Sequence, residues 1–191
     1  MTSVMWKRFS YAFAAVVVMT IALVAKDVRT ISIRDDCDQA TFDAAVGEGT
    51  CVGDGETTFE EFLAALADGG HPKWRFNNSV TEADVAANAK NEGGEGHTFT
   101  PVARFGGGFI RDLNMGQDPV PECVQLVNGQ PIPATVPLPN GGQLNIFVPS
   151  AAVDATTVPA GEQSADMPLK RGANRFQCCI HPWMRSTVTR R

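Results

Sequence analysis

From His71 onward, frequent Gly, Pro and Asn residues divide the chain into short apolar segments. Segments this short leave little room for long helices. The chain has 191 residues, of which 18 are Gly and 12 are Pro. Helical apolar periodicity nearly disappears in this part, and the best segments alternate apolar with polar side chains. Short alternating segments bounded by turn residues are typical of an all-β sandwich. We therefore expect a β-sandwich over residues 71–191.

Seven segments of this part are expected to be strands. They are residues 74–76, 85–90, 96–100, 123–127, 143–148, 172–178 and 184–189. Side chains alternate along a strand, so Cys178 shares a face with Phe176 and is expected to point into the core. Residues 131–139 contain four prolines, which excludes a central strand and favours an extended surface connection.

Residues 26–70 are expected to form an N-terminal extension with a strand at 28–34 and short helices near 41–46 and 58–67. Thr58 and Glu61 are spaced as a capping box, which marks the start of the second helix. Its apolar stripe consists of Phe59, Phe62, Leu63 and Leu66. We expect this stripe to pack on the main domain, and a partner-binding helix is the alternative.

The first 25 residues carry an uncharged apolar run, residues 9–25, directly after Lys7 and Arg8. This arrangement is typical of an export signal. The run is also close to the shortest membrane-spanning length, about 17 residues, so an uncleaved membrane anchor is the alternative. Both predict an exported body, periplasmic or secreted, that can carry disulfides. Cys37 and Cys51 flank the first expected helix, and we expect them to pair.

The counts of histidine and cysteine limit the chemistry of this chain. Its three histidines are enough for one multi-histidine metal site, and its five cysteines cannot all pair. At least one thiol is therefore left for reactivity, metal ligation or intermolecular pairing. A net charge of −5 does not suggest nucleic-acid binding, which usually requires a basic surface.

A candidate metal site lies near the C-terminus, where Cys178, His181 and Met184 have the spacing Cys-x-x-His-x-x-Met. A strand followed by a tight turn can bring a thiolate, an imidazole and a thioether together. These ligands suit copper, which accepts two His and one Cys in a trigonal plane with a weak axial Met. The second histidine must come from elsewhere, and His97, at a Gly-rich turn that runs into a strand, is the candidate.

These residues resemble the cupredoxins, the type 1 (blue) copper proteins. The loop, in which Pro, an aromatic residue and Met follow His181, is similar to the short ligand loop of the amicyanins. The resemblance covers residues 71–191 and implies a Greek-key β-sandwich that carries single electrons between redox partner proteins, without being an enzyme. It implies one copper ion with His97, Cys178 and His181 as equatorial ligands and Met184 as the axial ligand.

Other interpretations stay open. The same ligands could store or deliver copper, or the domain could be a copper-free sandwich for adhesion or assembly. His97 could be an ordinary strand-end histidine, and Met184 could fill the core. A zinc site is disfavoured, because Cys178 and Cys179 are adjacent and zinc-binding cysteines are usually two to four residues apart. A copper enzyme would need a second metal site, for which only His71 is left.

This chain differs from many cupredoxins at two positions, and the differences bear on the rigidity and the reduction potential of the site. Many cupredoxins have Asn after the first His and Ser or Thr after the Cys, and these residues bond across the site, whereas this chain has Thr98 and Cys179. With Cys178 at copper, Cys179 faces away, and Cys123 is the other unassigned cysteine. A Cys123–Cys179 disulfide is one hypothesis, and two unpaired thiols are the other.

The resemblance also suggests where a redox partner would dock. It implies an exposed apolar patch around His181 and Trp183 as the route for electrons. The alternative is that Trp183 caps the core.

Overall fold

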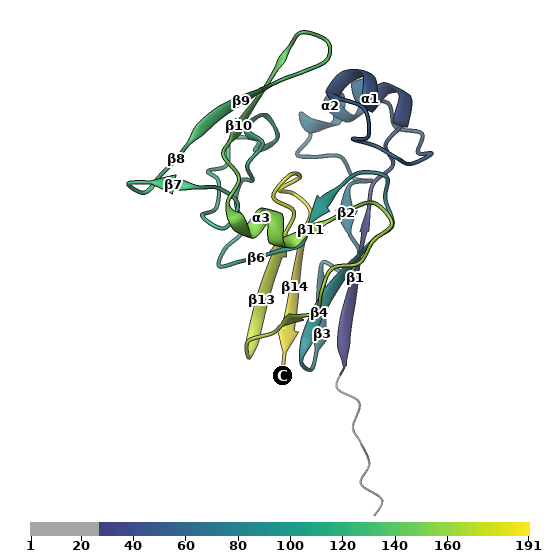
Figure 1. Cartoon of the computed structure of the whole chain (residues 1–191). Helices are drawn as coiled ribbons and strands as arrows, with labels where there is room; N and C mark the ends of the chain where they lie inside the picture. The colour runs from purple at the N-terminus through teal and green to yellow at the C-terminus, as the bar shows by residue number, and fades with distance from the viewer. Residues whose placement is uncertain (1–26) are drawn as a thin grey trace, which may run out of the picture.

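The computed structural model describes residues 27–191. The expected export signal or anchor, residues 1–25, lies outside the described residues. Strands predominate, and most belong to two four-stranded sheets (Figure 1). Over residues 27–191 we find no helix with the length and hydropathy needed to cross a membrane.

The first sheet has the order β12-β4-β1-β2. Its strands are β12 (Met167–Pro168), β4 (Ala86–Asn91), β1 (Val28–Arg34) and β2 (Arg75–Phe76). The expected strand at 28–34 is thus confirmed, and it runs parallel to β4 over its first six residues. β4 is rich in Ala and almost wholly buried, and it pairs with a strand on each side.

The second sheet has the order β3-β14-β13-β6. Its strands are β3 (Val80–Ala83), β14 (Arg185–Arg190), β13 (Gly172–Gln177) and β6 (Thr100–Val102). β13 and β14 form an antiparallel pair whose connecting loop holds the Cys-x-x-His-x-x-Met segment. β3 runs parallel to β14, so both sheets are mixed.

One apolar core joins the two sheets. It contains Ile31 and Ile33 of the first sheet together with Phe176 and Val188 of the second. Phe99 stacks on Phe176, with ring centroids 4.2 Å apart. Both Phe176 and Cys178 are buried, as their shared strand face predicts. The expected mostly-β fold is therefore confirmed, and two sheets that share one core are compatible with a β-sandwich.

The remaining strands form short pairs at one end of the sheets. β5 (His97–Thr98) pairs with β11 (Thr157–Val158), which follows helix α3 (Ala151–Thr156). β9 (Pro133–Pro137) and β10 (Gln143–Phe147) form a projecting hairpin, next to the smaller pair β7 (Leu126–Val127) and β8 (Gln130–Pro131) (Figure 1). A single 3-10 turn, η1, spans Arg111–Leu113.

The Pro-rich segment 131–139 is extended and largely exposed, as expected, but most of it is paired as strand β9 and does not form an unpaired connection. β9 has one partner, β10, so its prolines need no second ladder of hydrogen bonds. The prediction that they exclude a central strand is correct, because β9 lies at an edge.

Two short helices, α1 (Gln39–Val46) and α2 (Phe59–Leu66), lie near the end of the sheets where the β13–β14 loop turns (Figure 1). The capping box is present: Thr58 Oγ1 accepts from the amide of Glu61, and the Glu61 carboxylate accepts from the amide of Thr58. Phe62 is buried, whereas Leu63 is 47% exposed. The apolar stripe thus packs inward except at Leu63.

The expected Cys37–Cys51 disulfide is present, and so is the second bridge, which was one of two hypotheses. Cys37 is bonded to Cys51, and Cys123 is bonded to Cys179. Cys178 is the free cysteine, and it is buried. The hypothesis of two unpaired thiols at Cys123 and Cys179 is therefore wrong.

Candidate metal centre

The loop between β13 and β14 closes on itself through its backbone. The amide of Cys178 donates to the carbonyl of Met184 at 3.0 Å, and the amide of Met184 donates to the carbonyl of His181 at 2.9 Å. All three residues are at most 2% exposed. The turn is held in one shape from both ends, and it keeps a thiol, an imidazole and a thioether away from solvent.

His97 joins this loop from a distant part of the chain. It lies on β5, opposite Val158 of β11, and is completely buried. Its Nδ1 lies 3.7 Å from the Sγ of Cys178 and 3.3 Å from the Nδ1 of His181. The ligand atoms of His97, Cys178 and His181 all lie within 4.8 Å of one another.

These distances fit a single bound ion. An ion with bonds of about 2.0 Å to nitrogen and about 2.3 Å to sulfur, arranged trigonally, places two nitrogens about 3.5 Å apart and nitrogen and sulfur about 3.7 Å apart. The observed spacings of 3.3 Å and 3.7 Å are close to these values. One thiolate and two imidazoles are also the equatorial donor set that favours copper.

Met184, the fourth predicted residue, ends the ligand loop. It is 1% exposed and belongs to the same apolar cluster as Cys178. Its backbone bonds to Cys178 and His181 fix its place in the loop. The axial role of its sulfur stays a prediction.

The ionisation of the metal-free site favours a thiolate. Burial lowers the pKa of His97, but hydrogen bonds to Asp35 and Cys178 outweigh burial and raise the pKa to about 10. Burial opposes ionisation of Cys178, but hydrogen bonds and charges from His181 and His97 hold its pKa well below the ordinary thiol value. Because metals bind the deprotonated thiol, the protein lowers the cost of forming that ligand.

Backbone amides further stabilise the sulfur and join the two sides of the site. The amides of Thr98 and His181 donate to the Sγ of Cys178 at 3.4 and 3.5 Å. The Thr98 hydroxyl accepts from the amide of Cys179 at 2.7 Å. The cross-site bond that the departures at Thr98 and Cys179 seemed to remove is thus present, with a backbone amide as donor. The Cys123–Cys179 disulfide adds a covalent tie on the far side of the strand.

Two buried carboxylates lie next to the Nε2 atoms of the two imidazoles, and neither was expected from the sequence. Asp35 Oδ2 lies 2.8 Å from His97 Nε2. Glu95 Oε2 lies 3.8 Å from His181 Nε2 and also accepts from the indole N–H of Trp74. Burial raises the pKa of Glu95. A signal for Glu95 was available, because residues two apart in an extended segment face the same way, as Glu95 and His97 do.

Helix α2 covers His181, which corrects the expected exposed patch. The ring of Phe62 meets the edge of His181 at 5.9 Å between centroids and lies 6.2 Å from Trp183. The Trp183 indole N–H donates to the carbonyl of Trp74 at 3.1 Å. Gly70 packs so tightly on Trp183 that a Cβ there would lie 2.5 Å from the indole ring. His181 is consequently 2% exposed, and the patch expected around it is not open to solvent.

The third histidine, His71, lies away from the candidate metal ligands. His71 is 9% exposed, and its Nδ1 accepts from the amide of Lys73 at 3.2 Å. Its ring meets that of Trp74 with centroids 4.7 Å apart. Among residues 27–191, it belongs to neither cluster of potential metal ligands.

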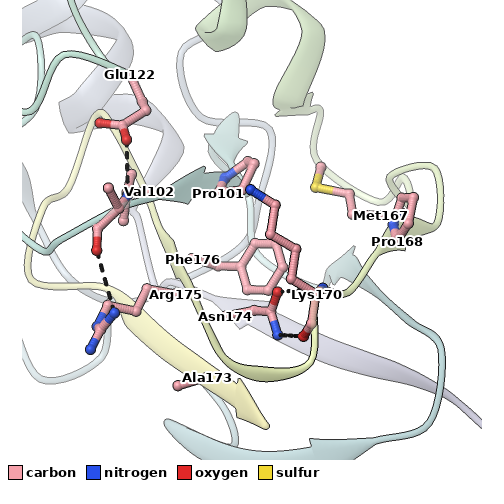
Figure 2. A pocket seen from close by; sticks show the side chains of 11 residues that line it. Pro101, Val102, Glu122, Met167, Pro168, Lys170, Ala173, Asn174, Arg175 and Phe176 are labelled. Atoms are coloured by element: carbon pink, nitrogen blue, oxygen red, sulfur yellow. Dashed lines mark hydrogen bonds between the residues drawn. The ribbon is translucent and has the colours of Figure 1, made fainter. Parts of the chain in front are cut away.

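A separate surface hollow lies between β6, β12 and β13 (Figure 2). Phe176 and Pro101 form part of its wall, and exposed Lys170 and Arg175 also line it. None of the four candidate ligands is among its lining residues. The candidate metal centre is therefore separate from this hollow.

The chain matches no protein-family model and gives no significant match to a curated protein.

Proposed function

We propose that this protein is an exported type 1 copper protein that carries single electrons between redox partner proteins, on a Greek-key β-sandwich. His97, Cys178 and His181 would hold the ion, with Met184 as a fourth, weaker ligand. Bound copper supplies one-electron redox chemistry. The observation that carries the proposal is that the chain's one free thiol meets two imidazole nitrogens in a closed, buried group.

The state of the cysteines supports this assignment. Four of them are paired in disulfides, and Cys178 alone is free. Disulfides persist in exported proteins, where the environment is oxidising. Cys178 is therefore kept as a free thiol in a chain that pairs its other cysteines, and metal ligation gives that thiol a use.

The burial of the ligands favours electron transfer over copper delivery. Delivery requires the ion to leave, but Cys178 is completely buried and α2 covers His181. A copper-free structural role explains the group less well, because it gives no use to a buried free thiol held next to two imidazoles. The two Nδ1 atoms lie 3.3 Å apart, which is close to the spacing of two nitrogens that share one ion.

Electrochemistry of the copper-loaded full chain tests the proposal. We expect one copper ion per chain, a reversible one-electron couple, and fast electron exchange between the oxidised and reduced proteins. Slow electron exchange combined with rapid transfer of copper to an apo acceptor would support delivery. A chain that binds no copper would contradict both copper functions.

A further inference from the structure

We propose that Asp35 is a positioning residue for His97, and that its charge lowers the reduction potential of the site. The second part of this inference rests on the proposed copper function. The geometry on which it depends belongs to the chain alone and can be tested without metal.

The imidazole of His97 is held between two partners. Its Nε2 lies 2.8 Å from Asp35 Oδ2, and its Nδ1 lies 3.7 Å from the Sγ of Cys178. The side chains of His97 and Asp35 are 0% and 1% exposed. A carboxylate can only accept from Nε2, so Nε2 carries a proton and Nδ1 of the neutral ring is left with its lone pair toward Cys178. Asp35 thus selects the tautomer that can bind a metal next to the thiolate.

Asp35 is itself fixed by backbone donors. Its Oδ1 accepts from the amide of Gly94 at 2.8 Å and from that of Cys37 at 3.4 Å, and its Oδ2 accepts from the amide of Glu95 at 3.2 Å. A Cβ at Gly93 would collide with the carboxylate, so the loop can wrap around Asp35 only with glycine there. These contacts set the carboxylate position before any metal binds, so the ring is aligned in advance.

The contact between Asp35 and His97 depends on how the strands of the first sheet are paired. Asp35 directly follows β1, which runs parallel to β4, and the loop after β4 leads to His97. The parallel pairing brings the ends of the two strands together, although Asp35 and His97 are 62 positions apart in the chain. The strand that the N-terminal extension adds to the sheet therefore delivers a charged partner to the ligand histidine.

A buried negative charge next to a ligand imidazole acts on the redox equilibrium. The Asp35 carboxylate is held by three amides and an imidazole N–H, all of which favour its ionised form. In a buried site, where screening by water is weak, its charge favours a doubly charged ion over a singly charged one. Partners that bond to ligand histidines also raise ligand basicity, which acts in the same direction. Asp35 therefore stabilises the oxidised site.

The variant Asp35→Asn tests the charge, with Asp36→Asn as the matched control. Asp36 is the next residue, but its carboxylate is directed to Lys73 and Thr57 instead of His97. We expect Asp35→Asn to weaken Cu(II) binding relative to Cu(I) about tenfold, which raises the potential by about 59 mV for one electron. The control should shift the potential by less than a third of this amount. Equal shifts in the two variants, or no shift, would overturn the inference.

Nitrogen-15 NMR of the unaltered, metal-free protein tests the positioning separately. The pKa of His97 is raised to about 10, so the spectrum is recorded above that pH, where the ring is neutral, and we expect the ring to carry its single proton on Nε2. A neutral His97 with its proton on Nδ1 would overturn the positioning role. This result needs neither copper nor a variant, so it stands even if the chain proves not to be an electron carrier.

Copper stoichiometry separates a positioning residue from a ligand. Asp35, Glu95 and His97 also form a group that could hold an ion. We expect one copper ion per chain in the wild type and in Asp35→Asn. A second ion that is lost in Asp35→Asn would show that Asp35 is a ligand, and it would overturn the role of Asp35 as a positioning residue.

Discussion

The ligand loop, residues 178–184, and the N-terminal cover, residues 35–70, contribute to the same site in different ways. The loop supplies three of the four candidate ligands from one tight turn. The cover supplies none of them, but it brings the Asp35 carboxylate to His97 and the Phe62 ring to His181. In the proposed copper protein, the loop would therefore supply most of the ligands, and the cover would set the charge and solvent around them.

Because ligands and surroundings come from separate segments, they can be changed separately. Variants in the loop should remove the metal site, whereas variants in the cover should keep it and change its stability, access or potential. Variants in both segments test this division.

Cys178→Ser should abolish the metal centre. Serine cannot supply a thiolate, so the intense visible thiolate-to-copper band should disappear. Copper affinity should fall by more than about 100-fold. Mutation of a residue that only hydrogen-bonds to a ligand typically costs about 10–100-fold. Absorption spectroscopy and a competition titration measure both effects. A serine variant that keeps the band would show that another residue supplies the chromophore.

Removing the Cys123–Cys179 disulfide should destabilise the protein more than removing Cys37–Cys51. The closed loops span 56 and 14 positions, which corresponds to about 4 and about 3 kcal/mol of unfolding free energy. Urea unfolding of Cys123→Ala/Cys179→Ala and of Cys37→Ala/Cys51→Ala measures the difference.

The two double variants should also differ in their spectra. Cys179 adjoins a ligand, so its loss should shift the copper spectrum, whereas loss of the Cys37–Cys51 bridge should leave the spectrum almost unchanged. The reverse pattern would contradict the division between loop and cover.

Phe62→Ala should loosen the cover without removing the site. Phe62 is 3% exposed and packs on His181, Trp74 and Trp183, so its truncation should cost about 3 kcal/mol. A chelator should then withdraw copper several-fold faster, while the visible band remains. Leu63→Ala is the matched control, because Leu63 is the next residue of α2 and is 47% exposed. Equal effects of the two variants would contradict the covering role.

Thr58→Ala should have the smallest effect. Loss of the N-cap side chain removes the hydrogen bond to the Glu61 amide and should cost about 1 kcal/mol. Thr58→Ser keeps the hydroxyl and should cost much less. Thermal unfolding of both variants measures the effect, and a copper spectrum that changes in Thr58→Ala would argue against a purely structural cap.

The sequence was most informative where interacting residues are close in the chain. Cys178, His181 and Met184 lie within seven positions between two alternating strands, so their convergence follows from one tight turn. The capping box at Thr58 is equally local. The Cys37–Cys51 bridge could also be predicted, because the two cysteines flank one short helix.

Long-range pairing explains what the sequence did not reveal. The contact of Asp35 with His97 depends on the parallel pairing of β1 with β4, for which local periodicity holds no information. The cover over His181 depends on Phe62, whose helical spacing predicts an inward face but not what that face meets. In β9, proline content excludes a central strand but is compatible with one partner at an edge.

The visible and electron paramagnetic resonance spectra of the Cu(II)-loaded protein decide whether these residues form a type 1 copper site. With His97, Cys178 and His181 as equatorial ligands, the protein should be intensely coloured by a thiolate-to-copper transition. The resonance should have the narrow copper hyperfine splitting of a type 1 site. A colourless protein, or an ordinary resonance without thiolate ligation, would contradict the assignment of these three residues to one copper ion.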